Sequence, residues 1–415
     1  MKLVSSRGGA LCGEANIPGD KSCSHRSLIL GGLAAGTTRI SGLLESDDVL
    51  ATARAVAALG ASVDQIAPHA WHVTGAPWTS PAEPVDCGNS GTAVRLLLGA
   101  CAGIGGLSVT FTGDASLSKR PMRRVTAPLE RMGARFEGGE HLPITAHGAN
   151  LGAIEFVNVP ASAQVKSALL LAGVTSGAAV AVAEPVPSRD HTEIMLAEFG
   201  DPLTGCEIMI ARDPSSAAFP LVAAAIVPGS EVTVRGLLVN PLRTGLYEVL
   251  EEMGADIMLA EERIQSGEIV ADMTLRHARL EPCHVPAERI AAMIDEIPAL
   301  AVACAFADGE SVIEGLAELR VKESDRLGAV VAGLVACGVA AIADGDALRI
   351  FGRGKVRGGG RVVTHGDHRI AMAFLTLGLA SEQSVEVDEG EMIATSFPGF
   401  VDLMRGLGAD IREAI

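Results

Sequence analysis

The sequence predicts an α/β or α+β chain with mixed sheets, assembled from six similar units. A motif consisting of a helical apolar pattern, a glycine, a small residue and a short β-prone run occurs six times. Helical and β-prone runs also alternate along the whole chain, as expected when helices and strands pack in layers. Of the 415 residues 48% are apolar, which is enough for a sizeable core. Because aromatic residues make up only 3%, this core must consist mainly of aliphatic side chains.

The six glycines of the motif are spaced by 73, 67, 54, 84 and 70 residues, or about one unit per 70 residues. They are Gly60, Gly133, Gly200, Gly254, Gly338 and Gly408. Each follows a helical pattern at the point where a C-cap requires left-handed backbone. Any α/β protein contains some such joints, but the even spacing favours a sixfold repeat grouped as three plus three. The third gap is short, so the unit around Gly200 is expected to have lost a part.

Charge and cysteine usage exclude several classes of protein. Lys and Arg total 33 and Asp and Glu total 50, a net charge of −17 that argues against general nucleic-acid binding. The eight cysteines form no CxxC pair, which excludes zinc ribbons and thioredoxin-type motifs, and we expect buried free thiols. The uncharged runs 96–113 and 167–183 are each expected to form a buried helix and strand rather than a membrane span. With no secretory signal at the N-terminus, we expect a cytoplasmic protein without membrane partners.

The first candidate site lies in Pro18–Arg26, between a predicted strand at Glu14–Ile17 and a predicted helix at Ser27–Ala35. Ser22 or Ser24 could cap that helix, and the exposed N–H groups would attract an anion. Lys21 and Arg26 would add full positive charges. The alternative is a plain helix start with basic surface residues, since the spacing is not that of a Walker A loop.

Similar joints between strand and helix follow along the chain. Gly88 and Gly91 in Asp86–Arg95 allow close approach to a ligand where a helix begins. Lys119-Arg120-Pro121 lies in a basic run, for which a solvated surface is the alternative. Two further candidate segments lie at the starts of predicted helices, Ser162–Lys166 and Ser188–Thr192. Asp213 is expected to be a structural cap at the start of another helix.

The later part of the chain supplies carboxylates. Asp295 and Glu296 precede a long apolar helix. Lys322–Arg326 holds two cations and two carboxylates, for which an exposed helical i,i+4 network is the alternative. Asp367-His368-Arg369 precedes another apolar helix, where the histidine could be structural. Taken together, these joints predict a cationic pocket for a multiply charged anion, with Asp295, Glu323 and His368 available for proton transfer.

Ten motifs in chain order closely resemble the 5-enolpyruvylshikimate-3-phosphate synthase family. They are PGDKSCSHR, CGNSGTAVR, DASLSKRPM, SAQVKSALLLAG, SRDHTE, DPSSAAFPL, IDEIPALA, LRVKESDR, DHRIAM and ATSFPGF. The resemblance runs from about Gly13 to Leu407 and so covers nearly the whole chain. Each motif alone is weak, but ten in series are specific.

The resemblance implies a two-domain inside-out α/β barrel in which each domain contains three βαβαββ units. One domain would span 18–212 and the other 1–17 with 213–415. The implied reaction transfers the enolpyruvyl group of phosphoenolpyruvate to the 5-hydroxyl of shikimate 3-phosphate and releases phosphate, on the pathway to chorismate and the aromatic amino acids. It needs no metal or organic cofactor, and we expect a monomer.

Residue by residue, the resemblance implies roles in catalysis and in binding each substrate. Asp295 would accept the proton of the 5-hydroxyl and Glu323 would move the proton at C3, with help from Lys21 and His368. Shikimate 3-phosphate would contact Lys21, Ser22, Arg26, Ser162, Ala163, Gln164, Ser188, Arg189, Asp295 and Lys322. Phosphoenolpyruvate would contact Lys21, Asn89, Gly91, Arg120, Gln164, Arg326 and Arg369.

The chain departs from the family pattern at several positions. Thr395 stands where many relatives have a lysine, Arg212 replaces a glycine and Ala163 replaces a serine. The stretch from His191 to Asp213 is about twenty residues shorter than the family pattern, so the third unit is expected to lack a hairpin. Gly91 leaves room where glyphosate-resistant relatives carry a methyl group, so glyphosate is expected to compete with phosphoenolpyruvate.

Two alternatives remain open from the sequence. The sister family that acts on UDP-N-acetylglucosamine shares the fold, but its loop cysteine is absent from Ser116–Pro121. A degenerate anion-binding homologue without activity would fit the shortened third unit, although Asp295 and Glu323 have no purpose in mere anion binding.

Overall fold

The computed structural model describes residues 1–414, which divide into two compact units. The N-terminal unit consists of Gly19–Ala211 together with Gln265–Glu268. The C-terminal unit consists of Met1–Pro18, Arg212–Ile264 and 269–414. Each unit has a separate hydrophobic core made mostly of aliphatic side chains. Among the described residues, no helix is long and apolar enough to span a bilayer.

The C-terminal unit contains three four-stranded sheets of one design. Their strand orders are β20-β21-β1-β22, β14-β15-β13-β2 and β16-β17-β19-β18. In each sheet two neighbouring strands are parallel, and two further strands complete the sheet on one side. These two strands form a hairpin in two of the sheets, whereas in the third they are β1 and β22, which pair antiparallel although they come from opposite ends of the sequence. The strands are β1 (Leu3–Ser6), β2 (Cys12–Glu14), β13 (Glu231–Leu238), β14 (Asp256–Gln265), β15 (Glu268–Arg276), β16 (His284–Val285), β17 (Asp308–Ile313), β18 (Ala340–Asp344), β19 (Ala347–Arg353), β20 (Arg361–Val362), β21 (Val385–Val387) and β22 (Asp410–Glu413).

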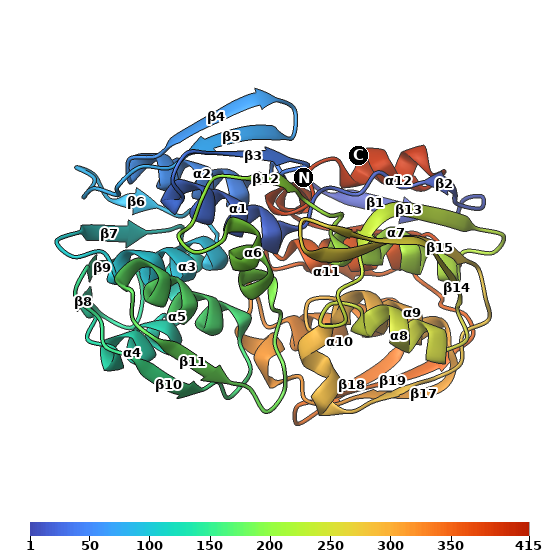
Figure 1. Cartoon of the computed structure of the whole chain (residues 1–415). Coiled ribbons are helices and arrows are strands. Elements are labelled where there is room, and N and C mark those ends of the chain that lie inside the picture. Colours follow the sequence, from blue (N-terminus) through green and yellow to red (C-terminus); the bar gives the residue numbers. More distant parts are fainter. Residues whose placement is uncertain (415) are drawn as a thin grey trace. The chain divides into compact units, whose positions relative to one another are not determined.

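The helices of this unit lie inside its sheets, as Figure 1 shows for α7, α9 and α11. All residues of α7 are buried, and so are nearly all of α9 and α11. Helices that are apolar all round belong in a core, whereas the strands alternate buried and exposed residues. The helices are α7 (Pro214–Ile226), α8 (Gly245–Glu252), α9 (Ile297–Phe306), α10 (Arg326–Ala336), α11 (His368–Gly378) and α12 (Phe400–Gly406). The inside-out arrangement predicted from the sequence is therefore confirmed.

The N-terminal unit repeats this design twice and then departs from it. Two sheets have four strands, in the orders β12-β3-β5-β4 and β6-β7-β9-β8, but the third contains only β10 and β11. The strands are β3 (Thr37–Ser41), β4 (Ser62–Ala67), β5 (Ala70–Thr74), β6 (Val85–Asp86), β7 (Ser108–Thr112), β8 (Arg135–Gly138), β9 (Ile144–His147), β10 (Ile154–Val157), β11 (Val180–Ala183) and β12 (Glu207–Met209). The helices are α1 (Lys21–Leu33), α2 (Asp47–Ala58), α3 (Gly91–Ala102), α4 (Arg123–Arg131), α5 (Ala163–Ser176) and α6 (His191–Phe199).

All six glycines of the repeat have positive φ angles, between 75° and 119°, at or just after a helix end. Left-handed backbone without a Cβ is the usual way to stop a helix. Four of these glycines are followed two residues later by the first strand of a hairpin, and Gly408 is followed two residues later by β22, which pairs with β1 from the other end of the sequence. Gly200 is the exception, because the chain runs from it to β12, which pairs with β3 in another sheet. The predicted loss of a hairpin from the third unit is confirmed.

The lost hairpin leaves β11 with one bare edge. In the five other sheets the strand corresponding to β11 has a parallel neighbour on one side and an antiparallel neighbour on the other. Among residues 1–414 β11 pairs only with β10. A hollow of about 1090 Å³ lies beside it, lined by apolar side chains that include Leu33, Trp78, Val174 and Leu196. The segment from Gly177 to Ala183, which includes this edge strand, contains no charged residue.

Several local predictions are confirmed and three are corrected. The uncharged runs form α3 with β7 and α5 with β11, as expected. The first helix begins at Lys21 rather than Ser27, and Asp20 caps it in place of Ser22 or Ser24. Cys12 is exposed and Cys206 and Cys283 are half-buried, so not every cysteine is a core thiol.

Candidate functional site

The N-terminus of α1 carries Lys21, Ser22 and Arg26 in its first turns. Asp20 accepts the N–H of Cys23, an interaction typical of helix N-caps. Lys21 forms an ion pair with Asp48. Lys21 and Ser22 are half-buried, which leaves them partly open to a ligand beside the positive helix end.

Arg26 is almost fully buried, with 3% of its surface exposed. Its Nε donates to Thr192 Oγ1 at 2.7 Å, and its Nη2 donates to Ser167 Oγ at 2.6 Å. Burial lowers the pKa of Arg26, because transfer of a cation out of water is unfavourable. Two hydroxyls from α5 and α6 thus orient a guanidinium at the start of α1.

The start of α3 joins four predicted phosphoenolpyruvate residues in one network. Arg120 Nη2 donates to Asn89 Oδ1 at 2.7 Å. Gln164 Oε1 accepts from Arg95 Nη1 at 2.9 Å. A Cβ on Gly91 would lie 2.7 Å from Nη1 of Arg95 and 3.3 Å from Nη1 of Arg120, so the glycine is needed for these guanidiniums to come this close.

The loop before α6 is anchored by an ion-pair cluster around Lys166. Its Nζ lies 2.8 Å from both Glu184 and Glu193, and it donates to the carbonyl of Ser188 at 3.2 Å. Burial alone would raise the pKa of Glu184, but hydrogen bonds from Lys166 and Ser188 outweigh it and lower the pKa. Lys166 thereby holds the segment that carries Ser188 and the half-buried Arg189.

At the N-terminus of α5, Ser162 occupies the N-cap position and Ala163 is the first helical residue. The carbonyl of Ser162 accepts from Asn158 Nδ2 at 3.0 Å. Ala163 has no hydroxyl to offer a phosphate, so any contact there must use its backbone. Gln164 follows directly and belongs to the network at α3.

In the C-terminal unit, three carboxylates surround the guanidinium of Arg326, which is 1% exposed. Asp367 Oδ2 lies 2.8 Å from Nε, Glu323 Oε2 lies 2.5 Å from Nη2, and Asp295 Oδ1 lies 3.4 Å from Nη1. Burial alone would lower the pKa of Arg326, but the charges of Asp367, Glu323 and Asp295 raise it. The permanent positive charge of Arg326 therefore holds both Asp295 and Glu323 in place.

Further cations and a histidine border this cluster. Lys322 Nζ lies 3.5 Å from Asp295 Oδ1, and Arg369 Nη1 donates to the Asp295 carbonyl at 3.0 Å. His368 begins α11, and its Nδ1 lies 3.4 Å from Thr395 Oγ1. Lys322 precedes α10 instead of lying within it, so the exposed helical network considered from the sequence is wrong.

Asp367 is the residue of this site that the sequence analysis missed as a functional candidate. It is fully buried, caps α11 through the N–H of Arg369 and binds Arg326. Burial alone would raise the pKa of Asp367, but the charge of Arg326 outweighs it and lowers the pKa. Its cap position was visible in the Asp-His-Arg motif, but its pairing across 41 residues was not.

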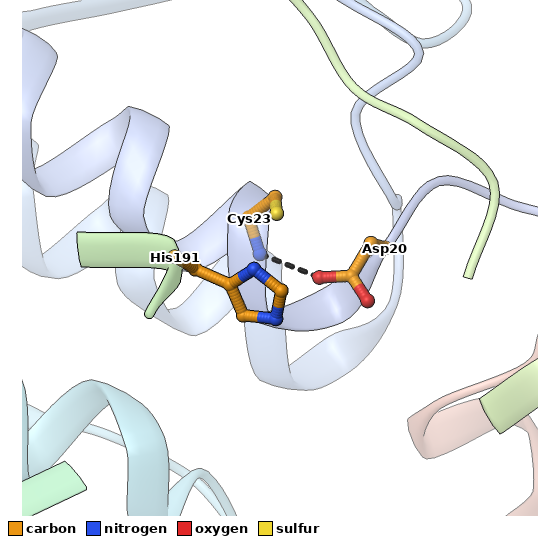
Figure 2. A group of neighbouring side chains, drawn as sticks. All are labelled: Asp20, Cys23 and His191. Carbon is orange, nitrogen blue, oxygen red and sulfur yellow. Dashed lines mark hydrogen bonds between the residues drawn. The ribbon is translucent and has the colours of Figure 1, made fainter. Parts of the chain in front are cut away.

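A second buried cluster joins Asp20, Cys23 and His191, whose ligand-type atoms lie within 4.8 Å of one another (Figure 2). His191 Nδ1 also pairs with Glu268 at 2.6 Å. Asp20 already caps α1, and the helix terminus, Lys21 and Arg26 add positive charge next to the cluster. A further cation would be repelled there, so the cluster is better explained as a hydrogen-bonded anchor for α1 and α6.

Comparison with known proteins gives one consistent result. The family model for EPSP synthase (3-phosphoshikimate 1-carboxyvinyltransferase) matches residues 6–404. A relative from Caulobacter vibrioides, named 3-phosphoshikimate 1-carboxyvinyltransferase, is 52% identical over 439 residues and covers 99% of each chain. A relative of the same name from Paracoccus denitrificans is 50% identical over 436 residues, covering 99% of this chain and 98% of its own. Since 439 aligned positions exceed 415 residues by 24, this chain lacks at least that many positions of the Caulobacter relative.

Solved structures agree in fold. An EPSP synthase from Acinetobacter baumannii superposes with a TM-score of 0.87 at 39% identity, with both chains fully covered. The enolpyruvyl transferase NikO from Streptomyces tendae shares the fold at a TM-score of 0.78 and 16% identity, covering 100% of this chain and 98% of its own. The family and the fold predicted from the sequence are thus confirmed, and neither alternative from the sequence is favoured. This chain belongs to the EPSP synthase (3-phosphoshikimate 1-carboxyvinyltransferase) family.

Proposed function

We propose that this chain transfers the enolpyruvyl group of phosphoenolpyruvate to the 5-hydroxyl of shikimate 3-phosphate. The observation that carries the mechanism is the pair of carboxylates, Asp295 and Glu323, held on the buried guanidinium of Arg326. A site that merely bound anions would gain nothing from carboxylates in this position, because they would repel the ligand. Carboxylates held in place are suited to moving protons.

In the first step, the 5-hydroxyl oxygen attacks C2 of phosphoenolpyruvate and Asp295 takes its proton. Glu323 delivers a proton to C3, so the carbon–carbon double bond becomes single and a tetrahedral intermediate forms. In the second step, the bond from C2 to the phosphate oxygen breaks and the leaving phosphate takes the proton held by Asp295, while C3 returns a proton to Glu323 and the double bond is restored. Lys21 and His368 are proposed to assist these transfers, and no metal or organic cofactor takes part.

We propose that the two substrates use different sets of cations and amide groups. Lys21, Ser22, Arg26, Ser162, Ala163, Gln164, Ser188, Arg189, Asp295 and Lys322 would bind shikimate 3-phosphate. Lys21, Asn89, Gly91, Arg120, Gln164, Arg326 and Arg369 would bind phosphoenolpyruvate. Paired charges and bidentate hydrogen bonds suit phosphate and carboxylate groups, which both substrates carry. Because three carboxylates already engage Arg326, contact with phosphoenolpyruvate would require it to exchange one of them.

One chain carries every residue of this mechanism, so we propose that a single copy suffices for turnover. Cytoplasmic location remains a prediction from the sequence.

The test is release of phosphate from phosphoenolpyruvate in the presence of shikimate 3-phosphate. Wild-type protein should release phosphate only when both substrates are present. Glu323→Gln keeps the shape of the side chain and should lower kcat by about 10²–10⁴-fold, because it removes a proton donor. Its Kd for shikimate 3-phosphate should change little. The control is Glu262→Gln, on the exposed face of β14, which should match wild type.

Two outcomes would contradict the proposal. Binding of both substrates without any phosphate release by the wild type would favour a non-catalytic anion-binding homologue. Full turnover by Glu323→Gln would remove Glu323 from the mechanism.

A further inference from the structure

Two thiols of the C-terminal unit lie in contact, although neither belongs to the site above. Cys283 Sγ and Cys304 Sγ are 3.6 Å apart. Cys283 directly precedes β16, and Cys304 lies in the last turn of α9. Both are free cysteines, and a disulfide requires about 2.05 Å, so the sulfurs would have to approach by about 1.5 Å.

The two thiols differ in access to solvent. Cys304 is completely buried, whereas Cys283 is half-buried and is followed by the exposed His284. A small oxidant can therefore reach Cys283 first, and Cys304 is protected from it. This is the arrangement of a reactive thiol backed by a resolving thiol.

The surroundings also make Cys283 the more reactive of the two. The contact with the thiol of Cys304 lowers the pKa of Cys283, and Ser311 acts in the same direction. The same contact, together with burial, raises the pKa of Cys304. Arg289 further favours the Cys283 thiolate, while Glu252 opposes it. A larger thiolate fraction means faster attack on an oxidant.

The backbone at Cys283 allows its sulfur to move closer to the sulfur of Cys304. β16 has only two residues and forms the edge of its sheet, where within the described part of the chain it pairs with β17 alone. Cys283 is held by its N–H to Ser311 Oγ at 3.2 Å and by its carbonyl to Val312 N at 2.9 Å. A short edge strand can shift more readily than the almost completely buried helix α9.

We propose that Cys283 and Cys304 form a peroxide-sensitive dithiol that closes to a disulfide. The Cys283 thiolate attacks a peroxide oxygen, so an S–O bond forms, the O–O bond breaks and hydroxide leaves to become water. The product is a sulfenic acid on Cys283. Cys304 then attacks that sulfur, so the S–S bond forms, the S–O bond breaks, and the Cys304 proton leaves with the hydroxide as a second water. Two thiols and one hydrogen peroxide thus give one disulfide and two waters.

The experiment uses the full chain, reduced and then freed of reductant. Hydrogen peroxide is added, remaining thiols are blocked with N-ethylmaleimide under denaturing conditions, and peptides are examined by mass spectrometry. We expect a cross-linked peptide pair containing Cys283 and Cys304, lighter by two hydrogens, that dithiothreitol separates. The control Cys12→Ser changes the exposed thiol and should keep the cross-link.

Two variants separate the steps. Cys283→Ser should abolish the cross-link and leave Cys304 reactive only with N-ethylmaleimide. Cys304→Ala should leave a sulfenic acid on Cys283 that dimedone captures. If Cys304→Ala fails to fold, the wild type and Cys283→Ser still decide the matter. The proposal is overturned if wild-type Cys283 goes on to sulfinic acid while Cys304 stays a thiol, or if neither reacts under conditions that oxidise Cys12.

Discussion

Replacement of Gly91 with Ala would place a methyl group beside the guanidinium groups of Arg95 and Arg120, and we propose that Arg120 binds phosphoenolpyruvate. The added Cβ would lie 2.7 Å from Nη1 of Arg95 and 3.3 Å from Nη1 of Arg120. Ordinary contact begins at about 3.4 Å, so Arg95 must retreat by about 0.7 Å while Arg120 barely moves. The perturbation therefore acts mainly through Arg95.

The size of the effect follows from what Arg95 holds. It is 6% exposed and cannot swing into solvent. Its Nη1 donates to Gln164 Oε1 at 2.9 Å, and its Nη2 donates to the Pro121 carbonyl at 3.2 Å. A retreat of about 0.7 Å would stretch the first bond beyond hydrogen-bond range. Loss of a charged hydrogen bond costs about 1.5–3 kcal/mol, equivalent to about 10–100-fold weaker binding.

The assay is the initial rate of phosphate release, with each substrate varied while the other is saturating. For Gly91→Ala, the KM for phosphoenolpyruvate should rise by about 10–100-fold. The KM for shikimate 3-phosphate should rise far less, since Gln164 is its only proposed contact in this network, whereas phosphoenolpyruvate is also proposed to contact Asn89, Gly91 and Arg120 there. Glyphosate, expected to compete with phosphoenolpyruvate, should inhibit the variant more weakly. Gly139→Ala is the control, because a Cβ there meets nothing within 4 Å.

The reasoning would be refuted by an unchanged KM for phosphoenolpyruvate, or by equal increases for both substrates. Either result would mean that the network at α3 does not hold the enol substrate.

Three further changes test other parts of the structure. Arg120→Ala should weaken phosphoenolpyruvate by about 10–100-fold and shikimate 3-phosphate much less, because it deletes a charge-assisted contact; equal losses measured by calorimetry would show that Arg120 serves the other ligand. Glu184→Gln should lower the free energy of unfolding by about 1–3 kcal/mol at pH 7. The pKa of Glu184 is lowered in the folded state. Its contribution to the free energy of unfolding is therefore fully present above the ordinary pKa of 4.5 and is lost below it, as the pH falls through the lowered pKa. Urea unfolding should therefore show the difference from wild type shrinking below pH 4.5, and a constant difference would contradict the assigned cause. Ala181→Lys places a charge on the bare edge of β11 and should reduce light scattering on heating without changing turnover; unchanged scattering would mean that this edge does not drive aggregation.

The sequence was sufficient for features that depend on local chemistry. A glycine after a helical pattern predicts a left-handed stop wherever it occurs, and all six positions have that backbone. The cap at Asp213 was likewise visible, because a cap depends on residues within one helical turn. The spacing of the glycines also revealed the missing hairpin, since a lost element shortens the chain by a countable length.

The tertiary structure alone decided how charges are paired and buried. Nothing in the sequence distinguishes Arg326, surrounded by three carboxylates, from an exposed helical arginine, because Asp295 and Asp367 lie 31 and 41 residues away. For the same reason the sequence did not show that Lys166 anchors a loop or that Cys283 lies against Cys304. Such pairings are set by how distant segments pack around a core, and residue order constrains that packing only through the whole fold.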